Sequence, residues 1–144
     1  MFPNLITTGL VALLLTSAAQ AENHDITMLN KGADGAMVFD PAFLQVAVGD
    51  TVTFSATDKG HNAESIKGML PEGVEPFKSA LGEGYVLTIT TEGLWGIKCT
   101  PHYTMGMVAL IQAGAPVNLE AATAVVQKGK AKTRFEPLFA RVVQ

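Results

Sequence analysis

Short stretches of alternating apolar and polar residues, separated by turn residues, run along residues 25–112. In residues 51–57, for example, Val52 and Phe54 share one face of such a stretch. Alternation with a period of two is typical of β-strands. The pattern predicts strands at residues 25–30, 36–39, 43–48, 51–57, 85–90, 94–99 and 107–112. Short strands at this spacing favour an antiparallel β-sandwich or barrel, a mainly β fold class.

Two segments interrupt the alternation. Asn30-Lys31-Gly32 is typical of a turn, so the first strand is expected to end there. Residues 58–84 are rich in glycine and proline. A connection of this length inside a compact domain is usually functional or contains short helical turns.

Beyond Gly114 the apolar positions adopt a helical period. Asn118 is placed to cap a first helix, and Phe135 and Leu138 belong to the apolar stripe of a second. Pro137 indicates that this second helix begins no earlier than about residue 134, because proline is accommodated best in a first turn. We expect two short C-terminal α-helices from about residue 116, packed on the β domain; the alternative is a disordered tail.

The first residues have the layout of a secretory signal peptide. An apolar block at residues 10–15 is followed by the small-x-small sequence Ala19-Gln20-Ala21. The block is too short to span a bilayer. We expect a signal peptide at 1–21, cleaved after Ala21, and one mature domain at 22–144; a buried N-terminal helix or strand is the alternative.

Charge and cysteine usage narrow the function further. The 144-residue chain has a net charge of −3, which disfavours sequence-independent nucleic-acid binding. No second apolar stretch approaches membrane-spanning length, so we expect no membrane span in the mature protein. The single cysteine, Cys99, cannot form an internal disulfide and is either an inert core residue or a reactive thiol.

The surroundings of Cys99 favour a metal site. Residues 98–107 lie between two predicted strands and contain a thiolate (Cys99), an imidazole (His102) and the thioethers of Met105 and Met107. Another imidazole, His61, follows a strand elsewhere in the chain. Two histidines and one cysteine with a weak axial methionine form the electron-transfer type 1 (blue) copper set. Spacing alone does not decide between the two methionines.

Other centres fit the residues less well. A closed zinc site needs four ligands, and the chain has one cysteine and three histidines. The C-x-x-C-H motif of covalent haem is absent. A catalytic Cys99–His102 pair is disfavoured because both residues lie in one tight loop. Three histidines are too few for a multicopper enzyme.

Several motifs together resemble the cupredoxins, and among these the pseudoazurins. They are residues 28–32, 35–39 and 49–54, Gly60-His61-Asn62, and the run from Cys99 to Met107. The resemblance covers nearly all of the predicted mature chain. It implies a Greek-key β-sandwich with two trailing helices, and one copper ion held by His61, Cys99, His102 and Met107.

The same resemblance implies a function. The chain would be a soluble, monomeric periplasmic one-electron carrier that donates to a copper nitrite reductase or exchanges electrons with cytochromes c. It would not be an enzyme. The alternative is a periplasmic copper carrier or chaperone that does not cycle between oxidation states.

Further residues are expected around the ligands. Asn62 is placed to hydrogen-bond to the Cys99 loop; the alternative is an ordinary turn asparagine. Pro101 removes a backbone donor near the sulfur, which is expected to influence the reduction potential. Met37 is interpreted either as a core residue or, with Pro101 and Met105, as part of an apolar patch around His102. The basic residues that resemble a docking ring around this patch are Lys31, Lys59, Lys78 and Lys98.

Overall fold

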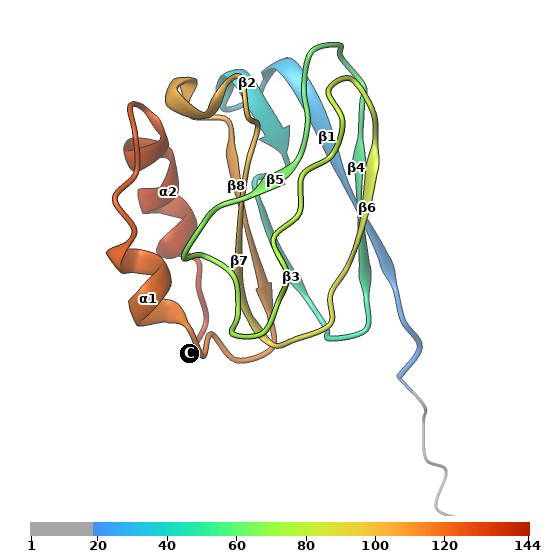
Figure 1. Cartoon of the computed structure of the whole chain (residues 1–144), viewed down its shortest axis with the longest axis vertical. Helices are drawn as coiled ribbons and strands as arrows, with labels where there is room; N and C mark the ends of the chain where they lie inside the picture. The colour runs from blue at the N-terminus through green and yellow to red at the C-terminus, as the bar shows by residue number, and fades with distance from the viewer. Residues whose placement is uncertain (1–18) are drawn as a thin grey trace, which may run out of the picture.

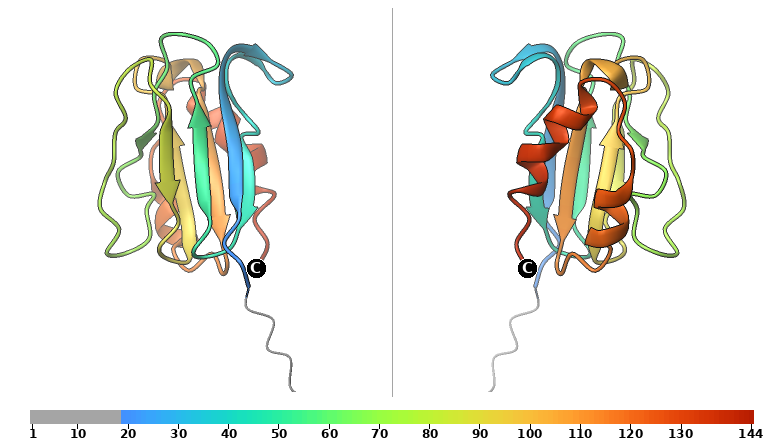
Figure 2. Two further views of the ribbon diagram at one scale, coloured as in Figure 1. Left: turned by 90° about the vertical axis from the view of Figure 1, so that its right-hand side faces the viewer. Right: turned by 90° about the vertical axis from the view of Figure 1, so that its left-hand side faces the viewer.

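A computed structural model describes residues 19–144 as two facing β-sheets with both helices on one outer side (Figures 1 and 2). One sheet has the order β2-β1-β4-β6 and the other β3-β8-β7-β5. The strands are β1 (Asn23–Gly32), β2 (Gly35–Asp40), β3 (Phe43–Val46), β4 (Thr51–Ser55), β5 (Glu64–Ser65), β6 (Tyr85–Thr88), β7 (Gly93–Lys98) and β8 (Val108–Ala113). The predicted mainly β sandwich with two C-terminal helices is confirmed.

The predicted alternation fills the space between the sheets. Val52 and Phe54 of β4 are fully buried, and Ile26 of β1 lies beside Phe54 in register. The Phe54 ring meets Phe39 of β2 edge-to-face, with the ring centroids 5.7 Å apart. Each such side chain contributes about 1.5–3 kcal/mol through burial, so this core holds the sheets face to face.

Trp95, the only tryptophan of the chain, lies in this core on β7. Its ring is 1% exposed, and its Nε1–H donates to the Thr91 carbonyl at 3.1 Å. Cys99 and Met107 belong to the same buried cluster. The core therefore continues without interruption to the end of the sandwich where these two residues lie.

The expectation of purely antiparallel pairing is wrong. β1 pairs with β4 in parallel, and β3 pairs with β8 in parallel. The reason is that the chain crosses between the sheets, from β2 to β3 and back to β4. A strand that returns after two crossings can lie beside an earlier strand and run in the same direction, which a direct hairpin does not allow.

Two further boundaries differ from the sequence prediction. β1 does not end at Asn30 but continues to Gly32, because Lys31 and Gly32 pair with Ala36 and Gly35 of β2. Residues 58–84 contain no helical turn; they hold the short strand β5 and otherwise irregular backbone. Within this segment, Glu64 and Ser65 pair with Lys98 and Ile97 of β7.

The helices are α1 (Leu119–Ala124) and α2 (Ala131–Phe139), on the outer face of the second sheet (Figure 2). Asn118 precedes α1 but does not cap it; its amide accepts from the Leu94 N–H at 2.6 Å and donates to the Leu94 carbonyl at 2.9 Å. Within residues 19–144, neither helix is long and apolar enough to cross a bilayer.

The expected start of the second helix is also wrong. α2 begins at Ala131, with Pro137 inside it. Ala131, Phe135 and Leu138 are buried, and their packing outweighs the one backbone hydrogen bond that Pro137 removes. Pro137 is exposed, so water can satisfy the carbonyl that loses its partner.

Candidate metal centre

Three donor atoms from two distant segments meet at one end of the sandwich. His61 follows β4, whereas Cys99 and His102 follow β7. The distances are 3.1 Å between the two Nδ1 atoms, 3.7 Å from Cys99 Sγ to His61 Nδ1, and 3.5 Å from Sγ to His102 Nδ1. A point equidistant from the corners of this triangle lies about 2 Å from each, close to a metal–imidazole bond length. The donor set therefore fits one metal ion.

His61 is oriented so that the lone pair of its Nδ1 points towards this position. Its Nε2 lies 2.8 Å from Asn30 Oδ1, and an amide oxygen only accepts, so Nε2 carries the proton. Nδ1 is thus unprotonated and faces Cys99 and His102. Burial, and secondly the neighbouring His102, lower the pKa of His61, which favours the neutral form that a metal needs.

Asn30 is not among the sequence-predicted site residues, because it resembles an ordinary turn residue. Its contact with His61 joins residues 31 positions apart. The only available signal is its position inside the pseudoazurin-like segment of residues 28–32.

Cys99 is a fully buried free thiol. Burial raises its pKa, while the backbone N–H groups of Asn62 and His102 act in the opposite direction. Without a metal the thiol is therefore protonated at neutral pH. Metal binding as thiolate must displace that proton.

The loop that carries the remaining donors is closed by its own backbone. The Cys99 N–H donates to the Met107 carbonyl at 3.0 Å, and the Met107 N–H donates to the His102 carbonyl at 3.1 Å. Between them lies the 3₁₀ turn η1 (Tyr103–Met105), followed by Gly106 in the left-handed region at φ 92°. These bonds restrict the loop to a narrow range of conformations.

The two methionines occupy different environments. Met107 is fully buried in the cluster that contains Cys99, whereas Met105 is 43% exposed. Burial beside the thiol favours Met107 as the axial thioether. The exposed Met105 lies on the outer side of the loop.

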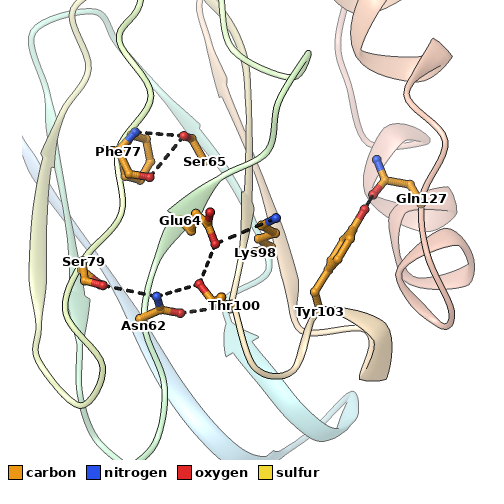
Figure 3. A network of polar contacts seen from close by, with 9 residues as sticks. All are labelled: Asn62, Glu64, Ser65, Phe77, Ser79, Lys98, Thr100, Tyr103 and Gln127. Carbon is orange, nitrogen blue, oxygen red and sulfur yellow. Dashed lines mark hydrogen bonds and ion pairs between the residues drawn. The ribbon is translucent and has the colours of Figure 1, made fainter.

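A hydrogen-bond network in which the direction of each bond is fixed supports the loop that begins at Cys99 (Figure 3). Asn62 Oδ1 accepts from the Thr100 N–H at 2.7 Å, and its Nδ2 donates to Thr100 Oγ1 at 2.8 Å and to the Ser79 carbonyl at 3.2 Å. The Thr100 hydroxyl donates to Glu64. Because a carboxylate only accepts, Glu64 directs the hydroxyl proton outward and leaves its lone pair for Asn62. Glu64 is not among the predicted residues.

The surface around His102 is mixed. Pro101 and Met105 are exposed and His102 is partly exposed. Met37 is half-buried, packs against the core, and has a left-handed φ of 52°. Met37 therefore combines features of a core residue and of the apolar patch around His102, the two interpretations made from the sequence.

The four predicted docking lysines differ in their freedom. Lys31, Lys59 and Lys78 are exposed. Lys98 is partly buried, lies 3.9 Å from the Glu64 carboxylate, and sits over the Tyr103 ring at 5.1 Å from its centroid. Its charge is partly compensated within the molecule.

Comparison with known proteins extends this geometry. Residues 26–114 match the copper-binding proteins of the plastocyanin/azurin family. The chain is 50% identical over 144 residues to the pseudoazurin of Paracoccus pantotrophus, covering 99% of each. The crystal structure of pseudoazurin from Methylobacterium extorquens AM1 has a TM-score of 0.82 at 45% identity, covering 84% of this chain and 99% of that chain. For native pseudoazurin from Hyphomicrobium denitrificans the TM-score is 0.81 at 47% identity, covering 85% and 99%.

The two sheets and the two helices together form a cupredoxin fold. The histidine–cysteine–histidine set with a buried methionine fits one copper ion per chain. Such a centre transfers single electrons between redox partners and performs no substrate chemistry. The chain therefore belongs to the pseudoazurins, copper electron carriers within the plastocyanin/azurin family of copper-binding proteins.

Proposed function

We propose that the chain is a periplasmic one-electron carrier whose copper is held by His61, Cys99, His102 and Met107. The observation that carries this proposal is the triangle formed by Cys99 Sγ and the Nδ1 atoms of His61 and His102. The two imidazoles, the thiolate and the Met107 thioether would together hold the ion, a donor set typical of electron-transfer copper. When bound, copper supplies the Cu(I)/Cu(II) couple.

The residues of the chain have separate tasks. Cys99 binds as thiolate, and the buried His61 excludes water from that side. The partly exposed edge of His102 gives a partner the shortest approach to the site. The loop bonds from Cys99 to Met107 keep the donor atoms in place during a change of charge, so little rearrangement accompanies transfer. Burial of Cys99 and Met107 also disfavours the alternative of a copper carrier that hands its metal over.

Copper titration and reduction test this function. Adding Cu(II) to the purified apoprotein should produce one intense thiolate-to-copper band in the visible spectrum at one ion per chain. Reduction followed by dialysis and reoxidation should restore the band fully. Absence of the band would contradict the ligand set, and loss of copper on reduction would support the carrier alternative.

The proposal includes export. We infer a signal peptide at residues 1–21, of which 1–18 lie outside the described residues. Residues 19–22 are exposed and lack regular structure, which suits cleavage after Ala21. The intact mass of protein recovered from the periplasm should correspond to a chain beginning at Glu22. Recovery of the uncleaved chain from the cytoplasm would contradict this.

The proposed partners are a copper nitrite reductase or cytochromes c, which would dock on the surface around His102. Exposed Lys31, Lys59 and Lys78 support attraction of an acidic partner to a monomeric carrier. Electron-transfer rates with each partner should fall steeply as ionic strength rises, because salt screens this attraction. A rate independent of salt would remove the lysines from the proposal.

A further inference from the structure

The guanidinium of Arg134, on α2, reaches three backbone carbonyls beside the metal centre. Nη1 donates to the carbonyls of Met37 at 3.0 Å and Gly106 at 3.2 Å, and Nη2 donates to Ala36 at 2.9 Å. Within residues 19–144, no carboxylate forms an ion pair with Arg134. The planar, charged fork of arginine suits such divergent acceptors, whereas a lysine ammonium is a single point donor.

Two glycines leave room for this side chain. A Cβ added to Gly106 would lie 2.8 Å from Arg134 Cγ, and one added to Gly35 would lie 3.2 Å from Nη2. Both glycines also have positive φ, at 92° and 118°. The backbone next to the metal centre is thus shaped to admit Arg134.

The contact with Gly106 bears directly on Met107. The carbonyl of Gly106 and the N–H of Met107 belong to the same peptide group. Arg134 binds the carbonyl, and the Met107 N–H donates to the His102 carbonyl at 3.1 Å. The peptide that leads into Met107 is therefore held at both ends.

The contact with Met37 bears on the β1–β2 hairpin. Met37 has a left-handed φ of 52°, which costs a non-glycine residue free energy and requires support from its surroundings. It lies across from Asn30 in the β1–β2 hairpin, where the Asn30 N–H bonds to Asp58 instead of to Met37. The Asn30 side chain orients His61. Arg134 thus holds the strand that faces Asn30, since the neighbours of Asn30, Leu29 and Lys31, pair with Val38 and Ala36.

We propose that Arg134 is a positioning residue for the copper site, acting on Met107 through Gly106 and on His61 through Met37 and Asn30. The proposal rests on the ligand set proposed above. It assigns a task to α2, which contributes no ligand: its arginine fixes the geometry of the site at the end of the sandwich.

Spectra and potentials of three variants test this. Arg134→Gln removes the charged fork and Arg134→Lys keeps the charge, while Arg141→Gln is the matched control, since Arg141 lies near the same helix but over the Phe43 ring at 4.7 Å. The Gln variant should shift the reduction midpoint and change the relative intensities of the thiolate-to-copper bands, and the Lys variant should shift both in the same direction. Arg141→Gln should keep wild-type values.

The outcomes separate the possible failures. Arg134→Gln with wild-type spectrum and midpoint, but lower stability, would overturn the proposal and leave Arg134 a structural residue. If that variant does not fold, Arg134→Lys is judged by the same readouts. A wild-type protein without a thiolate-to-copper band would instead refute the ligand set.

A second, independent observation lies at the opposite end of the sandwich. The buried carboxylate of Asp50 accepts from the Glu22 N–H at 2.9 Å, from His24 Nε2 at 2.8 Å and from the Ala47 N–H at 2.9 Å. The backbone bonds from Glu22 and Ala47, followed by His24, lower the pKa of Asp50 to about 2. The Asp50 carboxylate is thus a preformed hydrogen-bond acceptor, and one of its oxygens accepts from the backbone N–H of Glu22.

We infer that Asp50 binds the α-ammonium group of Glu22 once the chain has been cleaved after Ala21. This inference rests on the proposed cleavage site. Cleavage converts a neutral amide N–H into a charged donor 2.9 Å from a carboxylate, and so turns a hydrogen bond into an ion pair. In the pocket at this point, the titratable side chains are those of Glu22, His24 and Asp50. Removal of the leader would then stabilise the domain that it releases.

Acetylation supplies the matched control. Two chains beginning at Glu22 are compared, one with a free amine and one acetylated, which keeps an N–H donor but removes the charge. At pH 6 the free amine should give a several-fold smaller unfolding equilibrium constant. The carboxylate raises the folded pKa of the amine, so the difference is complete below the unfolded pKa of about 7.7 and is lost as pH rises through the folded pKa.

The difference should vanish in Asp50→Asn versions of both chains. If those do not fold, an NMR titration of the Glu22 amine decides: a pKa at its ordinary value overturns the inference, as do equal stabilities of the two chains. The mass of the exported protein tests the cleavage site separately.

Discussion

The two ends of the sandwich bury polar side chains in opposite electrostatic states. At one end Asp50 receives three donors, and its pKa falls to about 2, so it stays ionised. At the other end burial lowers the pKa of His61 and raises that of Cys99, so both are neutral. Asp50 is saturated by the protein itself, whereas the lone pairs at the other end face one another. Converging acceptors of this kind distinguish a ligand site from a structural polar site.

The largest effect should follow from Cys99→Ser. A serine hydroxyl does not ionise at neutral pH, so the thiolate-to-copper band should disappear completely. Absorption spectra of the copper-treated variant provide the measurement. Asp50→Asn, at the other end, should keep full band intensity. A serine variant with an intense visible band would contradict the role of the sulfur.

Copper binding should release protons in proportion to the number of copper ions bound. Because the pKa of Cys99 is raised and that of His61 is lowered, only the thiol must deprotonate at pH 7. We expect about one proton per copper ion, measured with a pH indicator in weakly buffered solution. In Cys99→Ser no proton should appear. Release of two protons would show that one of the two ligand histidines is protonated in the apoprotein.

Asn62→Ala should lower the free energy of unfolding, because it removes neutral hydrogen bonds at the copper end of the sandwich. Asn62 is 2% exposed, and its loss leaves the Thr100 N–H and the Ser79 carbonyl without their partner. The free energy of unfolding should fall by about 2–4 kcal/mol in urea titrations of the apoprotein. Thr27→Ala, which removes an exposed hydrogen bond to Asp40, is the control and should cost less than about 1 kcal/mol. Equal costs would contradict the importance of the buried network.

The smallest expected effect is a pH dependence of stability that comes from Asp50, at the end of the sandwich away from the copper site. The folded pKa of Asp50 lies near 2, below its ordinary 3.8. Its contribution to stability is therefore complete above about pH 4 and is lost as pH falls towards 2. The difference in urea midpoint between wild type and Asp50→Asn should shrink over that range. A constant difference would mean that Asp50 acts through packing alone.

Local pattern was sufficient to predict most of the strands and the candidate donor residues. Alternation marks Val52 and Phe54 because burial on one face of a strand repeats every second residue. Cys99, His102 and two candidate methionines, Met105 and Met107, share one loop, so their grouping is visible in the sequence, whereas the choice of Met107 came from the cupredoxin resemblance. Their meeting with His61 depends on the fold, and the cupredoxin resemblance supplied it.

Contacts between distant residues could not be predicted in this way. Arg134 binds Ala36 across 98 positions, and Asn30 binds His61 from what resembles a turn. Pro137 shows the same limit for a helix: its local preference is overridden by packing of Phe135 and Leu138 on the sheet. Pairwise contacts of this kind leave no periodic trace along a single sequence.

Trp95 gives the buried core an optical consequence. Trp95 lies on β7 and Cys99 directly follows that strand; both belong to the same buried cluster, four residues and about 13 Å apart along extended backbone. An indole enclosed by hydrocarbon fluoresces at short wavelength, and a nearby Cu(II) centre that absorbs light quenches such emission. Because the chain has no second tryptophan, its ultraviolet fluorescence reports directly whether the metal is present and oxidised.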